Sequence, residues 1–140
     1  MFYLDTNTCI YYLNGTFPLL QRRLLGHRPA EIMVPSIVKA ELIYGALKSR
    51  RREENLDTVR RFLQPFSVAT FGDEESEHYA EIRAELERAG MPIGANDLVI
   101  AATVRSQQGT LVTHNTQEFS RVPELAIEDW ATIPTVPPTA

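Results

Sequence analysis

The sequence predicts an α/β protein with three layers, in which helices cover both faces of a central, mainly parallel sheet of four to five strands. Short apolar segments alternate with longer segments of helical periodicity, as in parallel sheets joined by crossover helices. The apolar segments show no polar–apolar alternation, which is expected of strands buried on both faces. With 140 residues, 44% of them hydrophobic, the chain is long enough to bury such a core in one domain.

Five short segments are expected to form the strands. They are rich in apolar or β-branched residues and lie next to turn signals, because Pro35 follows the second segment and Gly109 precedes the fourth. The segments are residues 2–4, 32–34, 66–68, 110–113 and 126–127.

Helices are expected to fill the intervals between these strands. Ser36 suits the N-cap of a helix from Ile37 to about Arg52, and this helix is apolar nearly all round, which predicts that it is largely buried. Four other helices are expected at about residues 17–26, 54–63, 73–89 and 95–108. The domain is expected to span residues 1–132, and residues 133–140 are expected to form a flexible, proline-rich tail.

The composition excludes several classes of protein. A single cysteine, Cys9, rules out an internal disulfide framework and a cysteine-cluster metal site. No run of about 18 apolar residues occurs, and the N-terminus lacks the basic start and apolar core of a signal peptide. These features predict a soluble, cytoplasmic protein that does not cross a membrane.

The charge distribution is uneven. The net charge is −4, so the chain lacks the overall basic character of a general nucleic-acid binder. Between Lys48 and Arg61, however, six basic residues face only three acids, and Arg50, Arg51 and Arg52 are consecutive. Arginine suits bidentate contacts to phosphate, so this segment is either a solvated helix face or a contact to phosphate groups of a ligand.

Three acidic residues occupy positions where α/β proteins place functional groups. Asp5 directly follows the first strand, and Asp97 falls in the first turn of a helix. Glu41 interrupts the apolar helix, where a carboxylate is costly unless it is paired or bound to a cation. The carboxyl ends of parallel strands meet at one edge of a sheet, so these residues can converge. Simpler interpretations stay open: helix caps for the two aspartates, and an ion pair or partial exposure for Glu41.

Two further polar residues follow the fourth strand. Asn115 and Glu118 lie in the loop and turn there, and a loop with a capping asparagine is the alternative interpretation. If the acids share a small volume, they cannot all stay ionised without a cation. Oxygen ligands favour Mg²⁺ or Mn²⁺ over zinc. Such an ion beside a phosphate would lower the pKa of a bound water and stabilise charge at phosphorus.

Five segments in order carry a family resemblance: Leu4–Asn7, Ala40–Ala46, Pro92–Asp97, Leu111–Phe119 and Val122–Trp130. Through them the chain resembles the PIN-domain ribonucleases, and among these the VapC-type toxins of prokaryotic toxin–antitoxin pairs, from Met1 to about Trp130. The resemblance implies a compact α/β/α fold and cleavage of RNA that depends on Mg²⁺ or Mn²⁺. It also implies growth arrest, dimerisation and inhibition by a cognate antitoxin.

The resemblance also implies roles for individual residues. Asp5 and Asp97 match the principal metal ligands, and Glu41 matches a second acid that binds the ion or positions the attacking water. Many family members have an aspartate after the fourth strand; this chain has Asn115 there and Glu118 three residues later, so either could fill the fourth position. Toxins with a similar Asn-x-x-Glu-Phe segment include some that cut the anticodon loop of initiator tRNA. The expected substrate is therefore a structured RNA, with tRNA as its class.

Two other classes of function stay open at this point. An aspartyl-phosphate protein also places an aspartate, here Asp5, after its first strand. Such proteins generally need a lysine after a later strand, and the only lysines of this chain are Lys39 and Lys48. A PIN-like module that binds RNA or protein with little or no catalysis would explain the missing fourth aspartate.

Overall fold

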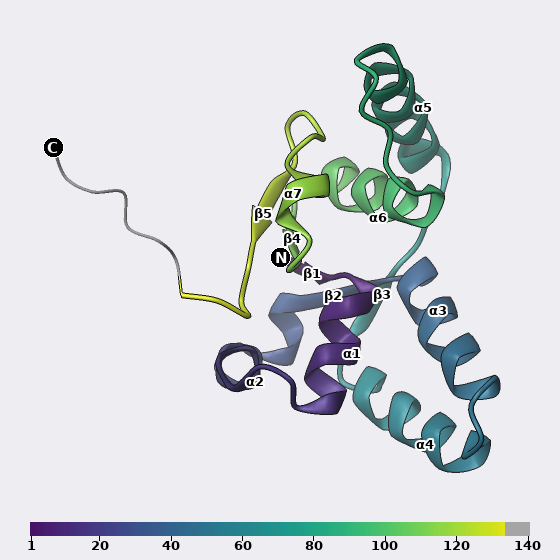
Figure 1. Ribbon diagram of the computed structural model, residues 1–140, viewed down its shortest axis with the longest axis vertical. Helices are drawn as coiled ribbons and strands as arrows, with labels where there is room; N and C mark the ends of the chain where they lie inside the picture. The colour runs from purple at the N-terminus through teal and green to yellow at the C-terminus, as the bar shows by residue number, and fades with distance from the viewer. Residues whose placement is uncertain (134–140) are drawn as a thin grey trace, which may run out of the picture.

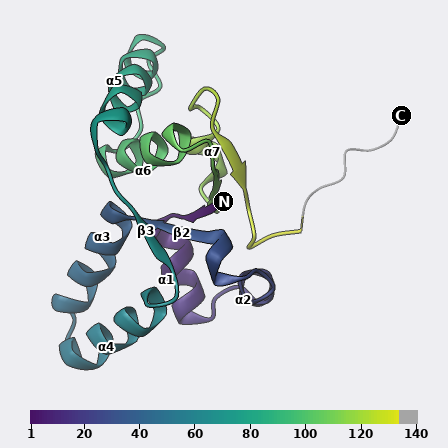
Figure 2. The same ribbon diagram turned by 180° about the vertical axis from the view of Figure 1, so that it is seen from behind.

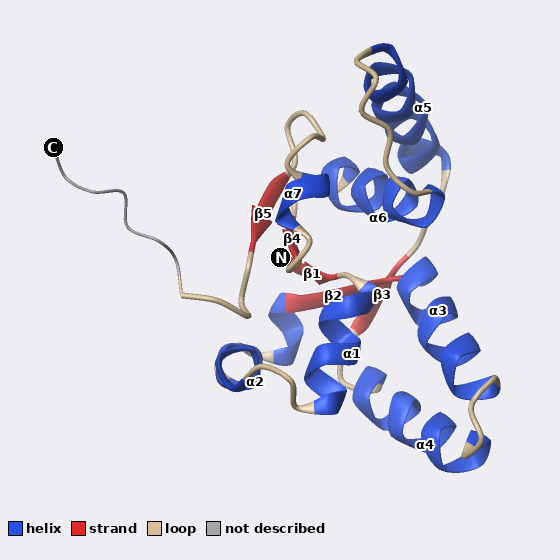
Figure 3. Cartoon of the chain, in the orientation of Figure 1, coloured by secondary structure: helices blue, strands red, loops and turns tan. Residues whose placement is uncertain are grey.

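The computed structural model describes residues 1–133, and its centre is a sheet of five parallel strands in the order β3-β2-β1-β4-β5 (Figure 3). The strands are β1 (Phe2–Leu4), β2 (Ile32–Pro35), β3 (Ser67–Ala69), β4 (Thr110–Val112) and β5 (Ala126–Glu128). Every neighbouring pair is parallel. The predicted fold class is confirmed, with five strands and no antiparallel pair among the described residues.

Helices cover the sheet on both sides. They are α1 (Thr6–Asn14), α2 (Pro18–Leu25), α3 (Ser36–Leu47), α4 (Arg52–Leu63), α5 (Asp73–Arg88), α6 (Ala95–Ser106) and α7 (Thr116–Phe119), with a 3₁₀ helix η1 (Pro29–Glu31). Helices α5 and α6 lie on one side, whereas α1, α3 and α4 lie on the other (Figures 1 and 2). None of the helices within residues 1–133 is both long and apolar enough to cross a membrane.

The core lies along the central strands. Leu4, Val34, Leu111 and Val112 have no exposed surface. Burial on both faces explains why these strands lack polar–apolar alternation. Cys9 is also completely buried, as a free thiol. Since the strands are parallel, the residues that follow β1, β2 and β4 all emerge at the same edge of the sheet.

The predicted helix over residues 37–52 is wrong at its C-terminal end, because α3 ends at Leu47. The Ser49 hydroxyl donates to the Ala46 carbonyl over 2.6 Å and accepts from Asn55 Nδ2 over 2.9 Å. A serine hydroxyl that bonds to nearby backbone offers the chain an alternative to helix, and here it closes a turn between two helices. Helix α4 then begins at Arg52, so α3 and α4 form a hairpin.

Two short helices were not predicted, and some other element boundaries differ slightly from those predicted. Helices α1 and α7 have no counterpart among the predicted helices, and β3 begins one residue later than predicted. Pro35, predicted to follow β2, is its last residue, in register with Ala69. Of the predicted tail at residues 133–140, only Ile133 lies within the described residues.

Candidate active site

Asp5 is held at the junction of β1 and α1. It caps the N-terminus of α1, since its Oδ1 accepts from the Thr8 backbone N–H over 2.8 Å. Its Oδ2 accepts from the Thr113 hydroxyl over 2.6 Å, which ties α1 to the end of β4. The residue is only 4% exposed. Burial raises the pKa of the Asp5 carboxyl above its usual value, although the hydrogen bonds from Thr113 and Thr8 oppose this rise.

Glu41 lies on α3 and faces the start of α1. The Thr6 hydroxyl donates to Glu41 Oε1 over 2.9 Å, and the side chain is half-buried. The expectation that α3 is largely buried is wrong, because Tyr44 is 63% exposed and Leu47 is 37% exposed. Only one side of α3 packs on the core, through Val38, Leu42 and Ala46.

Asp97 lies in the first turn of α6, three residues after the N-cap Gly94. Burial raises the pKa of its carboxyl to about 6, and the negative charges of Glu118, Asp5 and Glu41 add to the rise. A carboxyl is affected in this way only by acids that lie near it. The four acidic residues that the sequence singled out are therefore neighbours at the carboxyl edge of the sheet.

Asn115 and Glu118 lie on the same side of the site and contact each other. Asn115 Nδ2 donates to Glu118 Oε2 over 3.0 Å. The backbone N–H of Asn115 donates to the Thr113 hydroxyl over 2.9 Å, and that hydroxyl in turn donates to Asp5. Both alternatives for the fourth position are thus present at once, with Glu118 near Asp97 and Asn115 holding Glu118.

Two threonines that the sequence did not mark as site residues complete the site. Thr6 positions Glu41, and Thr113, which is 1% exposed, joins Asp5 to Asn115. Thr6 follows Asp5 directly and Thr113 ends the β-branched run of the fourth strand. This proximity to site residues is the only signal that could have marked them.

The donor set suits a hard divalent cation, although the side chains do not form a ready-made cage. Within residues 1–133, no three His, Cys, Asp or Glu side chains stand in position to hold one ion. Mg²⁺ keeps several of its own waters and takes one or two carboxylates directly, so it needs no such cage. Carboxylate oxygens are its preferred ligands, and its charge would offset both the burial and the acidic neighbours that raise the pKa of Asp97. The residues therefore fit a divalent ion.

The arginine run lies apart from the acids. Arg50 and Arg51 lie in the turn between α3 and α4, and Arg52 begins α4, so all three are at the tip of the hairpin (Figure 1). All three are exposed. Arg51 makes only a long ion pair with Glu54, at 3.8 Å. They are not part of the acid cluster.

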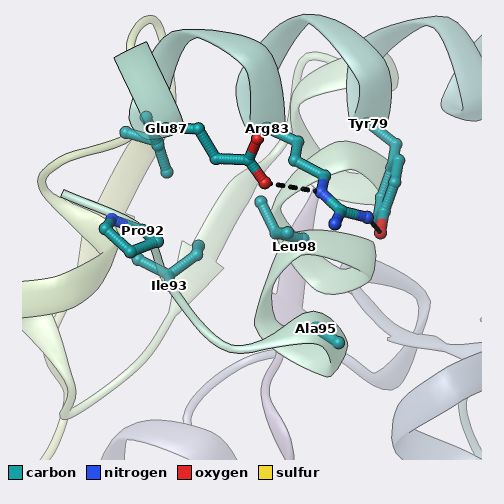
Figure 4. A pocket seen from close by; sticks show the side chains of 8 residues that line it. Tyr79, Arg83, Glu87, Pro92, Ile93, Ala95 and Leu98 are labelled. Carbon is teal, nitrogen blue, oxygen red and sulfur yellow. Dashed lines mark hydrogen bonds and ion pairs between the residues drawn. The ribbon is translucent and has the colours of Figure 1, made fainter. Parts of the chain in front are cut away.

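A separate cavity of about 200 Å³ lies between α5 and the start of α6 (Figure 4). Leu86, Ile93 and Leu98 are its apolar lining. At its rim, the Arg83 guanidinium bonds to Glu87 and to the Tyr79 hydroxyl. Ala95 and Leu98 flank Asp97 in the sequence, but none of the five predicted catalytic or metal-binding residues lines this cavity.

Comparison with known proteins places this fold and site in a family. The PIN domain family matches residues 2–125 of the chain. The chain is 39% identical to Ribonuclease VapC2 of Rickettsia felis over 93% of its own length and 98% of the relative. It is 40% identical to the tRNA(fMet)-specific endonuclease VapC of Salmonella typhimurium, over 92% of its own length and 97% of the relative.

Solved structures agree with these relatives. The fold superposes on VapBC2 of Rickettsia felis, bound to a DNA fragment from the promoter, with a TM-score of 0.86, 39% identity and coverage of 93% and 99% of the two chains. It superposes on DNA-bound VapBC of Salmonella typhimurium with a TM-score of 0.87, 39% identity and coverage of 92% and 97%. The chain therefore belongs to the PIN domain family, within its VapC group.

Proposed function

We propose that this chain is the ribonuclease toxin of a toxin–antitoxin pair and that it hydrolyses phosphodiester bonds of a structured RNA. The observation that carries the proposal is the group of acids at the carboxyl edge of the sheet, where Asp97 is partly buried and lies near enough to Glu118, Asp5 and Glu41 for their charges to act on it. Two relatives are named tRNA(fMet)-specific endonucleases, which supports initiator tRNA as the substrate. The Asn-x-x-Glu-Phe segment that begins at Asn115 is our reason for proposing its anticodon loop as the cleavage region. Such a substrate puts the activity in the cytoplasm.

The proposed cofactor is Mg²⁺, which Mn²⁺ can replace. Asp5 and Asp97 would hold it, and when bound it would supply positive charge to the scissile phosphate and lower the pKa of an attacking water. Asp5 is well prepared for this role, because Thr8 and Thr113 hold its two oxygens in a fixed orientation. A rigid ligand loses little conformational freedom on binding.

The other site residues are Glu41, which acts on the attacking water, and Asn115 and Glu118, which contact each other. We assign Glu41 the role of accepting the proton of the attacking water, with its carboxylate oriented by Thr6. Asn115 would position Glu118 through their hydrogen bond. Because water is the nucleophile, the substrate 2′-hydroxyl takes no part. A product with a 2′,3′-cyclic phosphate would contradict this mechanism.

The arginine run and the partners follow from the same proposal. Exposed guanidinium groups of Arg50, Arg51 and Arg52 would contact the RNA backbone away from the reacting bond. The solved relatives are VapBC complexes, which supports a cognate antitoxin as the protein partner. We also propose a homodimer, which light scattering on the purified chain would test through its mass.

The decisive experiment replaces single acids without changing their shape. Asp5→Asn and Asp97→Asn should each abolish cleavage of initiator tRNA, and excess EDTA should abolish cleavage by the wild type. Circular dichroism should show that both variants remain folded. Glu77→Gln, an exposed acid on α5, is the matched control and should cleave normally. Full activity of either active-site variant would refute the proposed site.

One alternative has an observation in its favour. The chain has Asn115 after the fourth strand, where many PIN-domain ribonucleases have an aspartate, as a PIN-like module that binds RNA or protein without cutting would. Expression without the antitoxin separates the two: the toxin arrests growth, whereas the module does not. The aspartyl-phosphate alternative is disfavoured, because such proteins need a lysine after a later strand, whereas Lys39 lies within α3 and Lys48 caps its C-terminus.

A further inference from the structure

One face of α3 leads away from the acid cluster and carries an exposed aromatic ring. Glu41, Tyr44 and Lys48 are three and four residues apart, so they lie on the same side of the helix. A rise of about 1.5 Å per residue places Lys48 about 10 Å from Glu41 along the axis, with Tyr44 between them. Ala40, Tyr44 and Lys48 are exposed, whereas Glu41 is half-buried at the edge of this face.

Tyr44 is unusually open for an aromatic residue. It is 63% exposed, the highest value among the aromatic residues of the described chain. Lys48 Nζ lies 5.1 Å from the centroid of its ring, in the geometry of a cation–π contact. An exposed ring next to a positive charge is the combination by which proteins hold single-stranded nucleic acid, through base stacking and attraction of the backbone.

Charge decides in which direction an RNA strand can leave the acid cluster. On the other side of the sheet, α5 carries seven acids and one arginine between Asp73 and Glu87, which repel phosphate. On the near side, α3 leads past Lys48 to the exposed arginines at the tip of the hairpin (Figure 1). A phosphate backbone is therefore attracted along α3 and repelled along α5.

We infer that Tyr44 stacks on a base of the RNA strand next to the scissile bond, while Lys48 contacts the adjoining phosphate. This inference rests on the proposed ribonuclease function and adds to it a binding site outside the acid cluster. Stacking tolerates any base, so Tyr44 contributes affinity and position rather than sequence choice. It acts on substrate binding and leaves the reacting groups unchanged.

The test compares variants of this face with variants that keep the ring or change the opposite side of α3. Tyr44→Ala removes the ring and Tyr44→Phe keeps it. Lys48→Ala removes the charge, and Lys39→Ala is its matched control, because nine residues of helix place Lys39 half a turn away from Lys48. Binding of a labelled anticodon stem–loop of initiator tRNA is measured by fluorescence anisotropy in EDTA, and cleavage of the same RNA is measured with Mg²⁺.

Loss of the Tyr44 ring should weaken binding of the RNA about tenfold. Tyr44→Ala should raise both Kd and KM by about that factor and leave kcat unchanged, whereas Tyr44→Phe should stay within about twofold of the wild type. Lys48→Ala should lower the slope of log affinity against log salt by about 1, and Lys39→Ala should not. Thermal melts should be equal for all four variants, since these side chains are exposed.

The outcomes separate this inference from the proposed function. If the wild type cleaves the RNA and Tyr44→Ala binds and cleaves it equally well, the inference is wrong and the ribonuclease function stands. If Tyr44→Ala weakens only the complex with the antitoxin, the face belongs to a protein partner and the inference is also wrong. If the wild type neither binds nor cleaves RNA, both fail.

Discussion

Replacing Asp97 by asparagine should stabilise the folded chain at neutral pH in the absence of divalent cations. Burial and the charges of Glu118, Asp5 and Glu41 raise the pKa of Asp97 to about 6, so its ionised form is disfavoured in the folded state. For an acid whose pKa is higher folded than unfolded, stability decreases as pH rises from the unfolded value of 3.8 through about 6. Asparagine cannot ionise, so the stability of the variant does not decrease in this way as pH rises.

The size of the gain follows from the same pKa. The difference between 3.8 and about 6 corresponds to roughly 3 kcal/mol at 1.36 kcal/mol per pKa unit. Asp97 is only half-buried, so solvent screening reduces the gain to about 1.5 kcal/mol. An unfolding entropy of about 2.1 cal/mol/K per residue then gives an increase in Tm of about 5 °C for a chain of this length.

The assay is thermal unfolding by circular dichroism in EDTA at pH 7.5 and again at pH 4. Asp97→Asn should melt about 5 °C above the wild type at the higher pH and close to it at the lower pH, where the wild-type carboxyl is protonated. Glu77→Gln is the control and should show no such gain at either pH. An equal gain at both pH values, or none at pH 7.5, would show that burial and the neighbouring acids do not raise the pKa of Asp97.

Three other outcomes are expected. Mg²⁺ should raise the Tm of the wild type and leave Asp97→Asn unchanged in differential scanning fluorimetry, because bound ligand stabilises only the chain that binds it. Thr113→Val should lower the unfolding free energy by about 2–3 kcal/mol in urea titrations, since a buried hydroxyl that bonds Asp5 and a backbone N–H is lost; no loss would contradict its joining role. Burial alone would raise the pKa of Asp129, but hydrogen bonds from His114, Ala131 N–H and Thr132 lower it overall. An acid with a lowered pKa stabilises the fold above its unfolded pKa, so Asp129→Asn should cost about 1 kcal/mol at pH 6 and progressively less as pH falls below 4, as measured by thermal melts; a cost that does not change with pH would refute this.

Much of the fold was predictable because it depends on local patterns. Parallel strands buried on both faces leave continuous apolar segments such as 2–4 and 110–112, and these predicted the sheet. Helix ends were harder. Ser49 ends α3 through contacts with Ala46 and Asn55, and a serine in a helical pattern gives no warning of a partner six residues away. Helix α1 was missed because Thr6, Asn7 and Thr8 have low helix propensity, and the cap by Asp5 compensates for it.

The candidate site, like the fold, was predictable in part from the sequence. Asp5, Glu41 and Asp97 could be singled out because a carboxylate at a strand end, in an apolar helix or in a first helical turn is conspicuous in a sequence. The hydrogen bonds that hold these acids in place could not be predicted from the sequence. Thr113 and Asp5 are 108 residues apart, and nothing local in either segment indicates that the two side chains meet. The exposure of Tyr44 could not be predicted either, because the sequence of its helix is apolar on nearly every side.

The sequence alone determined which residue types emerge at the carboxyl edge of the sheet, because a residue directly after a parallel strand must lie there. It also determined the class of ligand, since carboxylates select hard cations. Only the tertiary structure decided that Asp97 lies within reach of the charges of three other acids, that Asn115 and Glu118 are hydrogen-bonded to each other, and that Tyr44 faces solvent. Each of these depends on distances between segments far apart in the chain, which are set by the packing of helices on the sheet.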